Sequence, residues 1–175
     1  MTAGERIEAF QALGAELRMI LNNKPFTSAG EKLIELLPNV HVGNAWFTED
    51  NVRHRLRVIS EALEPATLTR WLSRYKIPDS QSSKTIGVIV AGNIPLAGID
   101  DFTQVLLCGH SYCGKQSKDD SKLLPLLAEI LIEIAPEFRK RILFTEGRLG
   151  TIDAVIATGS NNSSRYFEYY FSQYP

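Results

Sequence analysis

The chain is short of cysteine, of long apolar runs and of any excess of charge. Its 175 residues include two cysteines, and 19 lysines and arginines stand against 20 aspartates and glutamates. Two cysteines allow at most one bridge, which excludes a scaffold held together by disulfides. The formal net charge of -1 gives no electrostatic reason to expect a nucleic acid or an anionic membrane surface as partner. The composition, 44% hydrophobic and 22% charged, is that of an ordinary globular domain.

Membrane insertion has little support in the sequence. The longest apolar runs, such as residues 86–91, are far shorter than the roughly 20 residues that a membrane-spanning helix needs. Met1 is followed at once by the charged residues Glu5, Arg6 and Glu8, so no secretory signal is recognisable. We therefore expect no membrane span and a cytoplasmic location.

The first 83 residues carry apolar side chains at helical spacing in several stretches. Most of these stretches begin with a capping residue, and two add a glutamate three positions later, which completes a capping box. The predicted caps are Thr2 with Glu5, Ser28 with Glu31, and Thr48. Pro38 is expected to end the second helix, and Pro65 to interrupt the third. Residues 1–83 are therefore predicted to form a helical region that packs on the rest of the chain.

The polar stretch 78–83 marks a change of pattern, and residues 84–175 read as alternating strands and helices. Strands are predicted at 85–91, 111–115, 142–144 and 154–157, and helices at 100–107, 123–134 and 163–171. Such alternation with short connections predicts an open parallel sheet with right-handed crossovers. The expected fold class is α/β, with amino-terminal helices followed by an open, Rossmann-like sheet that binds ligands at the carboxyl ends of its strands.

Three polar turns are expected to meet at that edge of the sheet: residues 92–95, 115–118 and 158–160. The glycine-rich dinucleotide fingerprint and the P-loop are both absent, so a standard nucleotide site is not indicated. Gly159 and Ser160 at the start of the last helix offer backbone N–H groups and a hydroxyl to a pyrophosphate. Each turn alone is more simply explained as a helix cap or a solvated strand end. Together, on one edge, they predict a binding site.

Six short segments carry a more specific signal. They are Asn-Ala-Trp-Phe-Thr-Glu-Asp-Asn (44–51), Ala-Gly-Asn-Ile-Pro (91–95), Leu-Cys-Gly-His (107–110), Lys-Gln-Ser-Lys-Asp (115–119), Phe-Thr-Glu-Gly (144–147) and Ala-Thr-Gly-Ser-Asn-Asn (157–162). In combination they resemble the acyl-CoA reductases of the LuxC type, which are similar to aldehyde dehydrogenases. The resemblance implies a cofactor-binding domain of the aldehyde dehydrogenase type. It also implies reduction of an acyl-CoA or other acyl thioester to an aldehyde with NADPH, through a cysteine thioester.

The resemblance assigns roles to residues of the three turns. Asn93 would donate a hydrogen bond from its side-chain amide to the thioester oxygen; the alternative is that it only tolerates a left-handed turn beside Gly92. The implied cofactor-binding residues are Ile94, Lys115, Ser117, Lys118, Thr158, Gly159 and Ser160. Lys115 would lie near the adenosine ribose, and Lys118 stands where an acidic residue would favour NAD. A cation at that position favours NADPH.

Neither cysteine matches the nucleophile of that family. Cys108 and Cys113 are expected to be structural and buried, because reactive thiols need an exposed and electropositive setting. A zinc site built on Cys108, His110 and Cys113 is not expected, because no second cluster completes the ligand set. The nucleophile is thus expected outside this chain, which would be the amino-terminal part of a longer enzyme.

The aromatic carboxyl terminus agrees with a missing partner surface. Six of the chain's aromatic residues fall in its last ten positions: Tyr166, Phe167, Tyr169, Tyr170, Phe171 and Tyr174. A helix that is aromatic all round must bury most of its surface, against a further domain or in a homo-oligomer. Two other functions stay open: a non-catalytic α/β nucleotide-binding or assembly module, and a nucleotide-dependent enzyme with Asp100 and Asp101 as acid catalysts. Paired acids at that place are more often a helix start.

Overall fold

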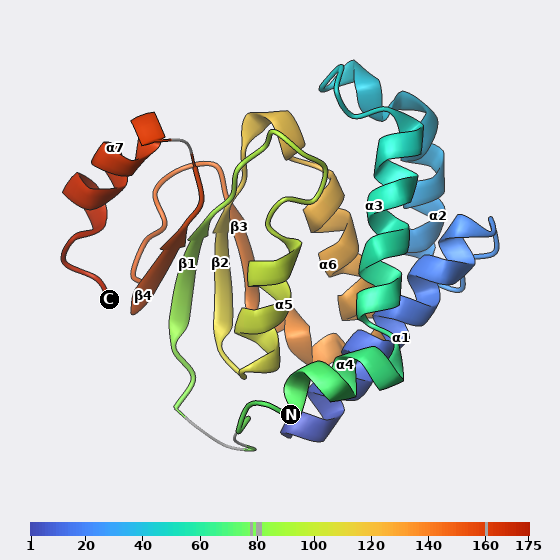
Figure 1. Ribbon diagram of the computed structural model, residues 1–175, viewed down its shortest axis with the longest axis horizontal. Helices are drawn as coiled ribbons and strands as arrows, with labels where there is room; N and C mark the ends of the chain where they lie inside the picture. The colour runs from blue at the N-terminus through green and yellow to red at the C-terminus, as the bar shows by residue number, and fades with distance from the viewer. Residues whose placement is uncertain (78, 80–81, 160) are drawn as a thin grey trace.

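The computed structural model describes residues 1–77, 79, 82–159 and 161–175. Helices make up its amino-terminal part (Figure 1). They are α1 (Ala3–Leu21), α2 (Ser28–Leu36), the 3-10 helix η1 (Leu37–Val42), α3 (Glu49–Ala62) and α4 (Pro65–Leu72). Pro38 lies in the first turn of η1, where its missing N–H costs no hydrogen bond. The predicted α-helical stop before it is therefore confirmed.

Two of the three predicted caps are confirmed. Thr2 and Glu5 form the capping box at the start of α1, and the Thr48 hydroxyl accepts a hydrogen bond from Asn51 N at 3.2 Å. The prediction for α2 is wrong by one residue, because Thr27 caps this helix and accepts from Gly30 N at 3.0 Å. Ser28 instead donates its hydroxyl to Glu133 at 2.7 Å.

The predicted α/β class with an open parallel sheet is confirmed. The strands are β1 (Thr85–Ile89), β2 (Ser111–Lys115), β3 (Ile142–Thr145) and β4 (Ala154–Ala157). They lie in the order β3-β2-β1-β4, and every neighbouring pair is parallel. Because all strands run the same way, their carboxyl ends share one edge of the sheet.

The remaining helices follow the strands. They are α5 (Ile99–Leu107), the 3-10 helix η2 (Lys118–Asp120), α6 (Leu123–Ile134), the 3-10 helix η3 (Pro136–Lys140) and α7 (Asn161–Phe171). Figure 1 shows α7 beyond β4, away from the other helices. In the part of the chain that the structure describes, no helix is both long and apolar enough to cross a bilayer.

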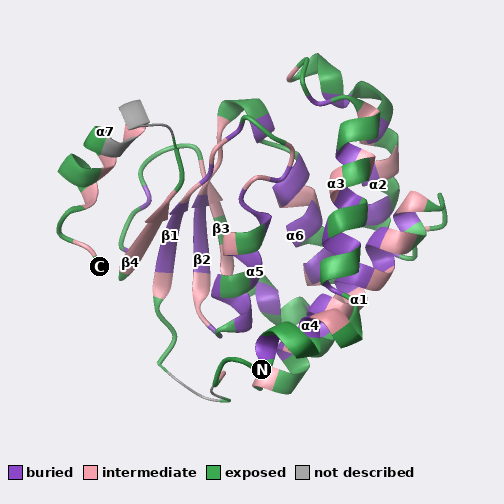
Figure 2. Ribbon diagram, viewed as in Figure 1, coloured by how far each residue is buried: buried purple, intermediate pink, exposed green. Residues whose placement is uncertain are grey.

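One continuous core joins the amino-terminal helices to one face of the sheet (Figure 2). Phe10 of α1 makes edge-to-face contacts with Phe102 of α5 and Phe138 of η3, at centroid distances of 6.4 and 5.9 Å. Phe102 in turn meets Tyr112 of β2 at 5.1 Å. The buried Arg6 adds a polar link, because its Nε donates to Leu107 O at 2.8 Å.

The opposite face of the sheet has a smaller cover. Its buried cluster consists of Cys113, Leu149 and Ile152. Leu149 and Ile152 belong to the connection between β3 and β4, the two outer strands. This connection crosses the face of the sheet without a helix. A Cβ on Gly87 would lie 2.8 Å from Ile152 Cδ1 and 3.0 Å from Leu149 Cδ1. Glycine in β1 therefore lets this connection lie flat on the sheet.

Candidate functional site

A pocket of about 580 Å³ opens at the carboxyl ends of β1, β2 and β4. This is the edge at which open parallel sheets bind ligands. Its walls come from the three turns that follow these strands, together with the first turns of α7. The lining residues are Ile89, Val90, Ala91, Gly92, Asn93, Lys115, Gln116, Ser117, Asp119, Thr158, Gly159, Ser163 and Phe167.

The structure brings most of the predicted site residues together here. Asn93, Lys115, Ser117, Thr158 and Gly159 all line the pocket. Two predicted residues lie outside its lining. Ile94 is 52% exposed, and Lys118 lines a separate hollow of about 140 Å³ beside η1. The remaining predicted residue, Ser160, falls outside the described residues.

The turn after β1 packs tightly on the turn after β2. A Cβ on Gly92 would collide with the Ser117 side chain, so this close approach requires glycine. Farther along the same turn, Leu96 is fully buried and has a φ of 57°. This left-handed conformation is unfavourable for leucine and must be held by its surroundings.

Asp120 supplies that hold. Its carboxylate accepts a hydrogen bond from Leu96 N at 2.8 Å and a longer one from Leu123 N at 3.4 Å. Burial raises the pKa of Asp120 above its ordinary value, and the two backbone hydrogen bonds oppose part of that shift. The carboxylate thus joins the β1–α5 turn to the beginning of α6 and fixes one side of the pocket.

Asn93 projects from this fixed turn into solvent. Its side-chain amide engages in no hydrogen bond among the described residues. A neutral amide without a partner at the rim of a pocket can donate to an oxygen that gains negative charge. The geometry thus offers a hydrogen-bond donor to a ligand oxygen at this rim.

Lys115 and Ser117 provide polar groups on the opposite wall. Lys115 is the last residue of β2 and pairs in register with Ile89. The Ser117 hydroxyl oxygen accepts from Asp119 N at 3.2 Å, which leaves its O–H able to donate to a ligand. Among the described lining residues, the charged ones are Lys115 and Asp119, one of each sign.

The third wall depends on close packing between β4 and α7. Thr158 N donates to Ile89 O at 3.1 Å, which extends the pairing of β4 with β1. A Cβ on Gly159 would lie 2.9 Å from the Phe167 ring and 3.0 Å from Ser163 Cβ. Glycine therefore allows the amino end of α7 to come close to the pocket, where helix N–H groups favour anions.

Sequence reasoning missed Ser163 and Phe167 as pocket residues. They are four positions apart on α7, so they share one face of that helix. The sequence shows this spacing, but it does not show which face of α7 is turned toward the pocket. Gln116 also lines the pocket, between the predicted site residues Lys115 and Ser117.

The two cysteines lie away from the pocket lining. Cys108 follows the last residue of α5 and is exposed, so the expectation that it is buried is wrong. The reason is its place at the helix end rather than on the helix's apolar face. Cys113 is buried in β2, where burial raises the pKa of its thiol. Its Sγ donates to Leu149 O at 3.4 Å.

Neither aspartate of the alternative acid pair lines the pocket. Asp100 and Asp101 lie in the first turn of α5, and Asp100 forms an ion pair of 3.4 Å with Arg55. Burial raises the pKa of Asp101, and the neighbouring Asp100 adds to the shift. Within the described residues, no group of three His, Cys, Asp or Glu side chains is placed to hold a metal ion.

The described lining of the pocket combines the Asn93 amide, three hydroxyls, one lysine, one carboxylate and the amino end of a helix. Such a set suits an oxygen-rich, anionic ligand with an uncharged group beside Asn93. In comparisons with known proteins, no family model, no curated protein and no solved structure matches the chain.

Proposed function

We propose that the chain is the amino-terminal, cofactor-binding part of an acyl-CoA reductase that converts an acyl thioester to an aldehyde with NADPH. One observation carries the proposal. The three turns that bear the resemblance to these reductases line a single pocket at the carboxyl edge of the sheet. Residues as far apart in sequence as Asn93 and Thr158 thereby line one pocket.

The donor set of the pocket fits a dinucleotide. The amino end of α7 and the Thr158 hydroxyl favour a pyrophosphate, and Lys115 with Ser117 suits a ribose. Lys118, on η2 next to the pocket, is proposed to meet the additional phosphate that distinguishes NADPH from NADH.

Each residue then has a defined part in the reaction. NADPH supplies a hydride when it is bound. Asn93 orients the thioester carbonyl and donates a hydrogen bond to its oxygen as negative charge develops there. The turn carrying Asn93 is held by Asp120 through Leu96 N, so the amide is positioned before the substrate arrives.

The acyl group must also be accepted by a thiolate. Cys113 is buried with its pKa raised, and a thiol with a raised pKa is a poor nucleophile. Cys108 is exposed but lies at the end of α5, outside the pocket lining. We therefore place the nucleophile outside this chain.

Calorimetry with NADPH and NADH tests the cofactor assignment. We expect the chain to bind NADPH more tightly than NADH, and Lys115→Met to weaken binding of both. Lys118→Glu should weaken NADPH by about tenfold while sparing NADH, because only NADPH carries the extra phosphate. Lys140→Met, on η3 and away from the pocket lining, is the matched control and should change neither affinity. A wild-type chain that binds neither nucleotide would contradict the proposal.

One observation favours a second candidate, an assembly module without catalysis. Tyr166, Tyr169 and Tyr170 of α7 are 67%, 79% and 62% exposed, and aromatic side chains gathered on one helix are typical of interfaces. This candidate predicts self-association without nucleotide affinity, which light scattering and the same calorimetry distinguish from the first.

A further inference from the structure

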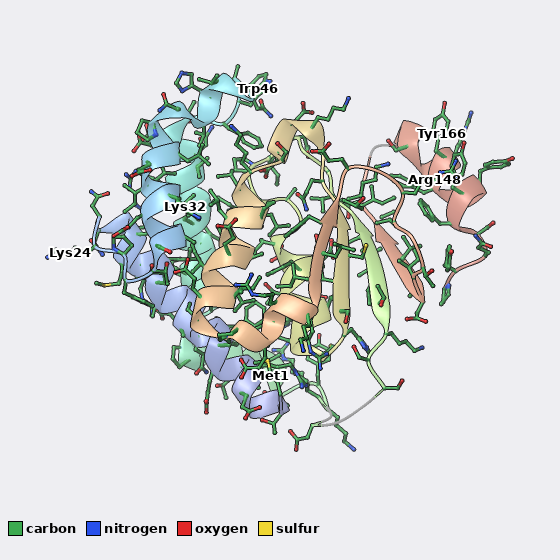
Figure 3. The ribbon with its side chains drawn as sticks, turned by 180° about the vertical axis from the view of Figure 1, so that it is seen from behind. Met1, Lys24, Lys32, Trp46, Arg148 and Tyr166 are labelled. Carbon is green, nitrogen blue, oxygen red and sulfur yellow. The ribbon has the colours of Figure 1, made fainter. Side chains whose placement is uncertain are left out.

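Trp46 is the most exposed large apolar side chain of the described residues outside α7, at 81%. Indole rings are highly buried on average, so this exposure needs an explanation. Figure 3 shows the residue at the tip of the loop between η1 and α3, away from the helices below it.

The loop around Trp46 is well fixed. Trp46 N donates to Asn44 Oδ1 at 3.0 Å, and Trp46 O accepts from Asn51 Nδ2 at 3.1 Å. The next residue, Phe47, is only 3% exposed and anchors the loop in the core. The backbone therefore holds the indole in solvent by defined contacts.

A second hollow, of about 440 Å³, lies beside this indole. Its lining residues are Gly43, Asn44, Trp46, Gly92, Asn93 and Asp119. Gly92, Asn93 and Asp119 also line the larger pocket, so the two hollows meet at Asn93. Asn44 Nδ2 donates to Gly92 O at 3.5 Å, which ties the Trp46 loop to the turn that carries Asn93.

The chemistry of this second hollow differs from that of the first. Asp119 lines both hollows, but among the described lining residues only the first has a cation, Lys115, to offset the repulsion between the carboxylate and phosphate groups. The free amide of Asn93 can exchange hydrogen bonds with a neutral amide, and the indole offers a flat apolar face on which such a group can stack. An uncharged ligand segment is favoured here, and an anionic one is favoured on the Lys115 side.

We infer that this second hollow, the Trp46 subsite, binds the uncharged, amide-containing arm of the acyl thioester. The inference rests on the proposed function. It places the acyl donor on one side of Asn93 and the cofactor on the other, so that an acyl carbonyl held by the Asn93 amide would lie within reach of the hydride donor.

Fluorescence of a single tryptophan tests the subsite. The chain has two tryptophans, so Trp71→Phe leaves Trp46 as the only reporter. The probes are S-octanoyl-N-acetylcysteamine, which has the acyl group and part of the arm but no nucleotide, and ADP, which has a nucleotide but no arm. We expect the thioester to change Trp46 emission in a saturable way and ADP to leave it unchanged.

Affinity measurements on the variants complete the test. Trp46→Ala should weaken binding of the thioester by about tenfold, the effect of losing one stacking contact. It should leave NADPH affinity and the unfolding temperature unchanged, because the indole is exposed. Trp71→Phe, on α4 and outside the subsite lining, should bind the thioester like the wild type.

Wild-type affinity of Trp46→Ala for the thioester would overturn the inference, as would equal responses of Trp46 to ADP and to the thioester, or no thioester binding at all. Failure of the proposed function gives a different result. In that case NADPH does not bind the wild-type chain, whereas the response of Trp46 to the thioester is measured separately and without cofactor.

Discussion

Asp120 is the residue through which the core most directly controls the shape of the pocket. It is 4% exposed, and its two backbone hydrogen bonds connect Leu96 with the start of α6. Buried carboxylates of this kind are costly unless they are paired, so the local structure depends on the donors that Asp120 satisfies.

Asp120→Ala should lower the free energy of unfolding by about 2–3 kcal/mol, because it leaves buried backbone N–H groups without an acceptor. It should also weaken NADPH binding, since Leu96 can then leave its left-handed conformation and move the turn that carries Asn93. Urea unfolding and calorimetry measure the two effects. Asp119→Ala is the control for stability: its side chain is exposed, and a change beyond about 0.5 kcal/mol would contradict this account.

At the scale of elements, Glu133 joins α6 to α2. Its carboxylate accepts from Ser28 N at 2.8 Å, from the Ser28 hydroxyl at 2.7 Å and from Ala29 N at 3.0 Å. Desolvation alone would raise the pKa of Glu133, but the hydrogen bonds from Ser28 and Ala29 outweigh it and lower the pKa. The carboxylate thus caps α2 from a distant helix and also meets the favourable end of the helix dipole.

Glu133→Gln should destabilise the chain at pH 7 by about 1 kcal/mol, through loss of charge-assisted bonds to a helix start. Because the folded-state pKa is lowered, this contribution is present above the ordinary value of 4.5 and is lost as the pH falls through the folded-state value. The difference between wild type and variant should therefore shrink on acidification, which unfolding curves recorded from pH 7 to below the folded-state pKa would show.

Glu129→Gln is the matched control, because Glu129 also reaches α2 from α6. It does so through an exposed ion pair of 3.1 Å with Lys32, and exposed pairs contribute little. If Glu133→Gln and Glu129→Gln lowered the free energy of unfolding equally, the proposed stabilisation of α2 by the Glu133 cap would be contradicted.

The same elements show what local sequence can and cannot predict. The strand at 154–157 and the caps Thr2 and Thr48 follow from local patterns, and the structure has them as predicted. Thr27 and Ser28 are both good caps, and the choice between them depends on Glu133, which is 105 positions away from Ser28. The crossing from β3 to β4 without a helix likewise depends on Gly87 in a strand much earlier in the chain.

Part of the candidate site could be predicted from the sequence, and part depends on contacts between distant segments. The turns after three strands could be located because parallel strands end at one edge. Which side chains of those turns line the pocket was not predictable, because the direction of each depends on contacts such as that of Gly92 with Ser117. Ile94 and Lys118 therefore fall outside the lining, and Ser163 and Phe167 fall within it.

At the scale of the whole molecule, the helical region and the sheet share one core. Residues 84–175 expressed alone should lack a cooperative fold, because removal of α1 to α4 exposes the apolar faces of α5 and α6. Far-UV circular dichroism and the dispersion of amide NMR signals measure this. A dispersed spectrum and a sharp unfolding transition for the fragment would show instead that the boundary at 83 separates two independent domains.

The late position of β4 has a consequence for the order in which the molecule is assembled. The contact between the residues just before β1 and β2, from Lys84 N to His110 Nδ1, spans 26 positions, whereas Thr85 N donates to Asp153, just before β4, across 68 positions. Closing the longer loop costs more chain entropy, and no helix in the 146–153 connection repays it early. We therefore expect the wall formed by Thr158 and Gly159 to be the last part of the pocket to form and the first to open. A ligand that touches this wall would slow the exchange of amide hydrogens in β4 more than in β2.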